Sequence, residues 1–142
     1  PEQRGLVLAM TRCLADAGLA PEDVDHINAH GTATPMNDLH EAHALRRVLG
    51  ERIANVPLTA NKAITGHASF ASGLIEAVAS VLTLQTGIGP PTAHYAEPHP
   101  ELQPLDDVAG QPREVAGAHV LSLSSAFAGL NAALLRRRAD RD

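Results

Sequence analysis

Short apolar segments alternate with helix-like segments along the 142 residues of this chain, and this alternation limits the possible folds more than any other feature. Runs that are typical of β-strands cover residues 24–29, 56–59, 115–124 and 130–136. Spacings that are typical of helices cover residues 2–17, 38–49 and about 66–85. This alternation predicts an α/β fold. The chain is long enough for one domain, whose core must consist of Leu, Val, Ile and Ala because only 2% of the residues are aromatic.

The ends of the first two predicted helices carry recognisable signals. Gly18 follows the first helix and Gly50 follows the second, and glycine is favoured at such ends. We expect Asp38 to cap the start of the second helix, with Glu41 completing a capping box three residues later. Cys13 lies on the apolar face of the first helix and is expected to pack, because a reactive thiolate needs an exposed, electropositive setting.

Residues 86–114 have no hydrophobic period and contain six prolines. A connection of this length without regular structure is uncommon in a compact domain. We therefore expect this segment to lie over a body that is outside the chain.

Charge and composition argue against several kinds of partner. The net charge is −5 and no basic stripe is present, so nucleic acid is not expected. No apolar run approaches the roughly 20 residues of a membrane span. The single Cys13 cannot form an internal disulfide, and we expect a cytoplasmic protein. Eight histidines are present without an HExxH motif or a cysteine pair, so no metal site is predicted.

Two stretches place an imidazole beside Gly and Thr at the junction of a strand and a helix: HGTATP (30–35) and NKAITGH (61–67). Two neutral histidines that converge on one point could donate paired N–H groups to a developing oxyanion. Their rings are therefore expected to lie close together. Lys62 could keep the local potential positive if a carboxylate such as Glu41 accompanies it. The alternative is that His30 and His67 are hydrogen-bonded structural residues.

Four stretches together resemble the C-terminal part of the β-ketoacyl synthases, the condensing enzymes of fatty-acid and polyketide synthesis. They are VDHINAHGTATPMNDLHEAHALRRVLG (24–50), NKAITGHASFASGLIEA (61–77), PPTAHYAEPHPEL (90–102) and LSLSSAFAGLNAALL (121–135). The resemblance implies the C-terminal portion of a thiolase-like fold, with a mixed sheet and a buried small-residue helix. It also implies an acyltransferase that performs a decarboxylative Claisen condensation of acyl and malonyl thioesters.

The resemblance assigns roles position by position. His30 and His67 match the histidines that promote decarboxylation and stabilise the enolate. Lys62 matches a lysine that pairs with the acid matching Glu41, and Asp38 would give further structural support. The family threonines that bind the phosphopantetheine arm match Thr32 and Thr34. No cofactor is implied, since the substrates are carried on the phosphopantetheine of acyl carrier protein.

The chain departs from the family pattern at two aromatic positions. Ser125 replaces the phenylalanine that gates the acyl pocket, in the stretch that continues to Phe127, and both positions would contact substrate. Phe70 stands where the family has glycine. These differences imply an altered acyl or partner surface.

No cysteine lies in the setting of a nucleophile, so we expect residues 1–142 to be the C-terminal portion of a larger unit. The N-terminal half with its cysteine, or a partner ketosynthase chain, would complete a homo- or heterodimer, and the isolated chain would be inactive. The alternative is a non-catalytic partner like the chain-length factors, which usually lack the catalytic histidines. A structural half of a thiolase-like fold without chemistry is a third possibility.

Overall fold

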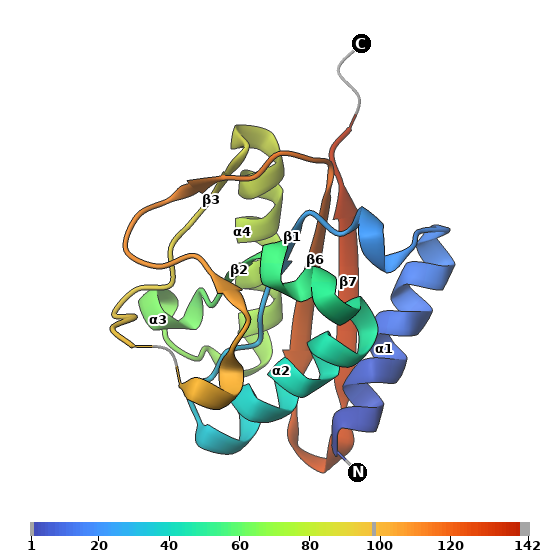
Figure 1. The fold of residues 1–142 in the computed structure, drawn as a ribbon, viewed down its shortest axis with the longest axis vertical. Helices are drawn as coiled ribbons and strands as arrows, with labels where there is room; N and C mark the ends of the chain where they lie inside the picture. Colours follow the sequence, from blue (N-terminus) through green and yellow to red (C-terminus); the bar gives the residue numbers. More distant parts are fainter. Residues whose placement is uncertain (1, 98, 140–142) are drawn as a thin grey trace.

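A five-stranded mixed sheet forms the centre of the structure, a computed structural model that describes residues 2–97 and 99–139 (Figure 1). Strand β1 (His26–Asn28) lies between β2 (Pro57–Thr59) and β6 (His119–Ser125) and is parallel to both. Strand β4 (Asp106–Asp107) continues the parallel part beside β2, whereas β7 (Asn131–Arg137) returns antiparallel to β6. The expected α/β fold with a mixed sheet is confirmed.

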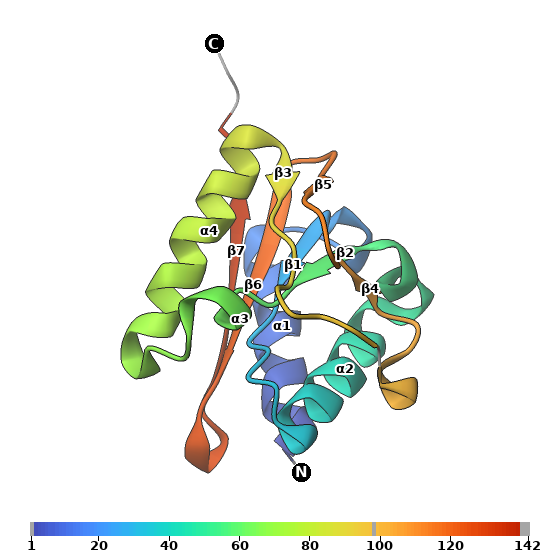
Figure 2. The ribbon, with the colours of Figure 1, turned by 90° about the vertical axis from the view of Figure 1, so that its left-hand side faces the viewer.

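Helices cover both faces of this sheet. Helices α1 (Glu2–Ala17) and α2 (Pro35–Leu49) lie on one face, and α4 (Ser72–Thr86) lies on the other (Figure 2). The short α3 (Lys62–Thr65) follows β2. Short 3-10 helices cover Pro21–Asp23, Gly50–Asn55, Ser69–Ala71, Pro100–Leu102 and Phe127–Gly129.

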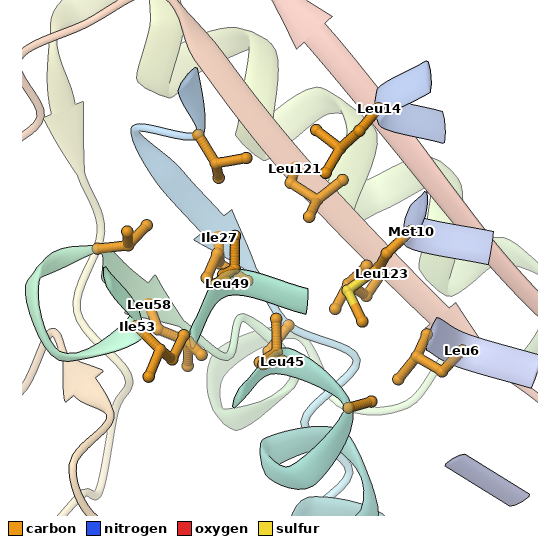
Figure 3. Packing of buried hydrophobic residues seen from close by; sticks show 14 residues of the cluster. Leu6, Met10, Leu14, Ile27, Leu45, Leu49, Ile53, Leu58, Leu121 and Leu123 are labelled. Carbon is orange, nitrogen blue, oxygen red and sulfur yellow. The ribbon is translucent and has the colours of Figure 1, made fainter. Parts of the chain in front are cut away.

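The hydrophobic core lies between the sheet and the α1–α2 layer (Figure 3). Leu6, Met10 and Leu14 are four residues apart on α1 and therefore share one buried face of that helix. They meet Leu121 and Leu123, which are two residues apart on β6 and so point to the same side of the sheet. Cys13 packs beside this cluster, and burial raises its pKa, as expected for a packing residue.

Helix α4 turns polar side chains toward the sheet and most of its large apolar side chains outward. Ser72, Glu76 and Ser80 are buried, whereas Leu74 is 71% exposed and Leu82 is 52% exposed. The described residues thus cover only one face of this helix. A helix in contact with water normally presents polar side chains outward, whereas α4 presents apolar ones.

Two predicted helix starts are wrong. Helix α2 begins at Pro35 with Thr34 at its N-cap, so Asp38 lies inside the first turn and forms no capping box with Glu41. Helix α4 begins at Ser72 and not near Gly66, because Ser69 has a φ of 53° that an α-helix cannot accommodate. The Gly18 and Gly50 ends are confirmed.

The proline-containing segment 86–114 pairs with other parts of this chain. This corrects the expectation that it lies over a body outside the chain. Strand β3 (Ile88–Gly89) pairs with β5 (Arg113–Glu114), and β4 adds an edge strand to the sheet. The side chain of Thr92 accepts a hydrogen bond from the Ala60 N–H at 3.0 Å. Prolines suit such an edge because few of its backbone N–H groups are needed by the sheet. Pro98 lies outside the described residues.

Candidate active site

Parallel pairing brings three loops to the same edge of the sheet. Asn28 in β1 lies opposite both Thr59 in β2 and Ser122 in β6, so β1 and β2 end together at their carboxyl ends, and β6 continues past the same edge to Ser125. In open α/β sheets this edge is the usual place for ligand binding. The loops that leave it carry His30, Lys62 and the turn at Phe127–Gly129.

His30 leaves β1 in a tightly held backbone. The two carboxylate oxygens of Glu41 accept hydrogen bonds from the backbone N–H groups of His30 (2.7 Å) and Gly31 (2.9 Å). Gly31 has a φ of 46°, and a Cβ at this position would lie 2.6 Å from the Cβ of Ala60. Glycine is therefore required where the loops after β1 and β2 meet. Burial raises the pKa of Glu41 to about 7, and the two N–H donors oppose this shift.

Lys62 binds Glu76 and not Glu41, which corrects the predicted pair. Its buried ammonium group donates to the Glu76 carboxylate, to the backbone oxygen of His30 at 2.6 Å, and to Nδ1 of His30 at 3.2 Å. These three acceptors use all three hydrogens of the ammonium group. Burial raises the pKa of Glu76, and the contact with Lys62 opposes the shift.

The contact with Lys62 fixes the chemical form of His30. An ammonium group can only donate, so Nδ1 of His30 must be the acceptor and the neutral ring must carry its hydrogen on Nε2. Burial, with the positive charge of Lys62 and the nearby His67, lowers the pKa of His30 to about 4. His30 is therefore a neutral N–H donor at physiological pH.

His67 has the same form for a different reason. The backbone N–H of Ser69 donates to its Nδ1 at 3.1 Å, and the hydroxyl of Ser72 lies 3.1 Å from the same atom. The neutral ring therefore carries its hydrogen on Nε2 as well. The His30 and His67 ring centroids are 5.6 Å apart with an interplanar angle of 88°, so the two rings lie close together as expected.

The two threonines of the HGTATP stretch lie side by side in the loop between β1 and α2. Their hydroxyl groups are 3.2 Å apart, and Thr34 is exposed. Asp38 follows in the first turn of α2, where its carboxylate accepts a hydrogen bond from Asn37 at 3.1 Å. This contact and the position in the helix replace the capping role that the sequence predicted.

The end of β6 and the turn that follows it hold the two predicted substrate-binding positions in different environments. The hydroxyl of Ser125 donates to the side-chain oxygen of Asn131 at 2.9 Å, and the Asn131 amide donates to the Gly129 carbonyl at 2.9 Å. Phe127 is 98% exposed in this turn. Phe70, at the other departure from the family pattern, is fully exposed on the turn before α4.

Glu76 and Ser72 belong to this site but were missed by the sequence analysis. Glu76 is the one charged residue in the apolar stretch from 72 to 84, a signal that could have marked it as a buried partner for a cation. Ser72 gives no such signal because serine is common at helix starts. In the part of the chain that the structure describes, no group of three or more His, Cys, Asp or Glu side chains could hold a metal ion. No helix in residues 2–97 and 99–139 has the length and apolarity needed to cross a membrane.

Comparisons with known proteins show the family to which this chain belongs. The family model of the β-ketoacyl synthase C-terminal domain matches residues 1–96. The chain is 42% identical over 134 residues to 3-oxoacyl-acyl-carrier-protein synthase 2 from Synechocystis sp., covering 94% of this chain and 32% of that relative. One chain of a solved complex, a type II polyketide synthase acyl-carrier protein with its ketosynthase bound to the hexaketide, gives a TM-score of 0.92 at 34% identity. That match covers 99% of this chain and 34% of the solved one.

A second solved structure, the ishigamide ketosynthase/chain length factor, also has a TM-score of 0.92. It is 36% identical and covers 97% of this chain and 34% of that chain. With more than half of its residues matched by the family model, the chain belongs to the β-ketoacyl synthase family and has its thiolase-like fold. It spans about a third of the length of the curated relatives it matches.

Proposed function

We propose that residues 1–142 are the C-terminal portion of a β-ketoacyl synthase that condenses acyl and malonyl thioesters in fatty-acid or polyketide synthesis. The observation that carries this proposal is the pair of rings, His30 and His67, held 5.6 Å apart with Nε2 protonated in each. Two neutral N–H donors at one edge of a sheet form an oxyanion site.

The reaction uses these donors at a single step. The malonyl thioester loses CO₂, and the electron pair of the broken C–C bond enters the thioester as an enolate. His30 and His67 donate from Nε2 to the enolate oxygen as its negative charge develops. The enolate carbon then attacks the acyl group on a cysteine outside these residues, a C–C bond forms, and the cysteine thiolate leaves.

Lys62 and Glu76 act on His30 and not on the substrate. The ammonium group of Lys62 prevents protonation of His30 at Nδ1, because both groups would then be donors. Glu76 offsets the charge of Lys62, so the buried cation is paired. Glu41 holds the backbone that carries His30. We assign catalysis to His30 and His67, with Lys62 as their electrostatic support.

The remaining loops are assigned to the substrate. Thr32 and Thr34 present adjacent hydroxyl groups that suit the amide and hydroxyl groups of a phosphopantetheine arm. Ser125 ends β6 and Phe127 lies in the turn that follows, at the same edge, and both would contact the acyl chain. No further cofactor is needed for this reaction. The partners would be acyl carrier protein and the N-terminal half that completes the enzyme, as one subunit of a dimer.

A complete enzyme that contains residues 1–142 allows a direct test. His30→Ala or His67→Ala should slow decarboxylation of malonyl-acyl carrier protein by about 10²-fold or more, because each removes one oxyanion donor. Acylation of the cysteine should suffer less. Equal loss of both half-reactions in both variants would show that the histidines are structural, and the proposal would fail.

A non-catalytic role like that of a chain-length factor is the other candidate, since one similar structure contains such a protein. The two histidines and their hydrogen-bond partners favour the enzyme. The residue at the nucleophile position of the N-terminal half decides between the two functions. A cysteine there supports condensation, whereas glutamine supports the non-catalytic partner.

A further inference from the structure

Ser72 is the first residue of α4, and its side chain is buried beside His67. Its hydroxyl oxygen lies 3.1 Å from Nδ1 of His67, and the residue is only 5% exposed. In residues 2–97 and 99–139 this ring nitrogen is the hydroxyl group's hydrogen-bond partner. Because the Ser69 N–H donates to Nδ1, this nitrogen is an acceptor, and the hydroxyl hydrogen is therefore donated to it as well.

The two donors on Nδ1 of His67 differ in how they are supported. The backbone N–H of Ser69 comes from an exposed turn in which Ser69 has a φ of 53°, a left-handed conformation that is unfavourable for residues other than glycine. Ser72 instead lies where α4 packs on β6. A Cβ at the next residue, Gly73, would be 3.2 Å from the Ser124 hydroxyl oxygen, so the helix start is held close to the strand.

His30 and His67 therefore have the same tautomer because of different hydrogen-bond partners. The ring of His30 is held by the ammonium group of Lys62, which is itself fixed by three acceptors. The ring of His67 is more exposed, and its one donor from a buried side chain is Ser72. Loss of that donor would leave the orientation of His67 to the strained turn.

We propose that Ser72 is a positioning residue that acts through His67, fixing the ring so that its Nε2–H points to the reacting oxygen. This inference rests on the proposed function, because it concerns the decarboxylation step assigned to His67. Ser72 itself does not touch the substrate in this proposal. It acts only on the orientation and tautomer of the ring.

The test uses the complete enzyme with Ser72→Ala. Loss of one neutral hydrogen bond should slow decarboxylation of malonyl-acyl carrier protein by between about twofold and tenfold. KM and cysteine acylation should stay unchanged. Imidazole ¹⁵N spectra should show a mixture of His67 tautomers in place of the single Nε2–H form. Ser72→Thr keeps the hydroxyl group and should restore both the rate and the spectrum.

Ser80→Ala is the matched control, since Ser80 is equally buried on the same helix and its hydroxyl donates to the Glu76 carbonyl, away from His67. If Ser72→Ala and Ser80→Ala lower both half-reactions alike, or if Ser72→Ala leaves rate and spectrum unchanged, the inference is wrong. If Ser72→Ala does not fold, the near-isosteric Ser72→Cys replaces it. Because a thiol is a weaker donor, its decarboxylation rate should lie between those of the wild type and His67→Ala, and a wild-type rate would contradict the inference. A normal rate in His67→Ala would instead overturn the proposed function itself.

Discussion

At the scale of single residues, Lys62 connects the loops after β1 and β2. Its ammonium group donates to two atoms of His30 and to the carboxylate of Glu76 in α4. A buried ion pair of this kind contributes little net stability, but the removal of one partner leaves an uncompensated charge. The pair thus fixes the geometry of the site more than it stabilises the fold.

We therefore expect Lys62→Met to lower the free energy of unfolding by about 3–5 kcal/mol, because Glu76 is left buried without its cation. The double variant Lys62→Met/Glu76→Gln should recover part of that loss. Urea unfolding of the complete enzyme measures both, with Glu76→Gln alone completing the cycle. Additive losses in the double variant would mean that the two side chains are not coupled.

Ser125 supports a second prediction at this scale, which depends on the proposed function. Ser125→Phe removes the hydroxyl bond to Asn131 and adds an aromatic ring at the edge of the site. In the complete enzyme the preferred acyl length should shift, or the exchange between acylation and condensation should slow. Ser125→Ala removes the same bond without the ring and should leave the acyl profile near wild type. An unchanged profile in Ser125→Phe would show that other residues control the pocket.

At the scale of elements, β1 contains a buried histidine that is separate from the site. Nε2 of His26 lies 3.1 Å from the Thr59 hydroxyl oxygen, whose hydrogen is donated to the Pro90 carbonyl at 2.7 Å. Nε2 must therefore be the donor, and Nδ1 has no partner among the described residues. Burial, followed by the charge of Arg113, lowers the pKa of His26 to about 4. Protonation would place a charge on an unpartnered buried atom.

The pH dependence of folding follows from this shift. Between the ordinary pKa of 6.5 and about 4, the unfolded chain binds a proton at His26 and the folded chain does not. Stability should therefore fall as the pH drops through this window, by up to about 3 kcal/mol. His26→Gln keeps a donor toward Thr59 but does not titrate, so its stability in the complete enzyme should change less from pH 7 to pH 4. Parallel pH curves for both proteins would contradict the role of His26.

Elements also show how far sequence reasoning reaches. Four strands of the sheet, the glycine helix ends and the two histidine stretches depend on local patterns, and these were predicted, although the strand predicted at 115–124 begins only at His119. The partner of Lys62 was not predicted, because Glu76 reaches Lys62 only through the packing of α4 against the sheet. The start of α4 was misplaced because Ser69 has a φ of 53°, which interrupts the helix while its N–H donates to the His67 ring. Contacts between elements that are distant in the sequence produce no local residue pattern, so the sequence does not predict them.

At the scale of the whole molecule, helices cover the core on one face of the described chain, whereas the other face exposes apolar side chains. The α1–α2 layer closes the core, whereas α4 presents Leu74, Val78 and Leu82 outward. Both phenylalanines of the chain are fully exposed as well. Apolar exposure of this extent marks a surface that another body normally covers. The sheet edge that holds His30 and His67, the proposed oxyanion donors, has no cysteine among the described residues, because Cys13 packs on α1.

Residues 1–142 on their own should therefore neither condense acyl groups nor remain a well-protected monomer. Without a thiolate that carries the acyl chain, His30 and His67 have no acyl-enzyme to act on, and the outward face of α4 favours association. Co-expression with the N-terminal half should restore solubility and activity together, as measured by size-exclusion chromatography and by product formation from acyl- and malonyl-acyl carrier protein. The chain expressed alone is the control. A monomeric, cooperatively folded chain that forms β-ketoacyl product without the other half would contradict both the proposed division of the enzyme and the chemistry assigned to it.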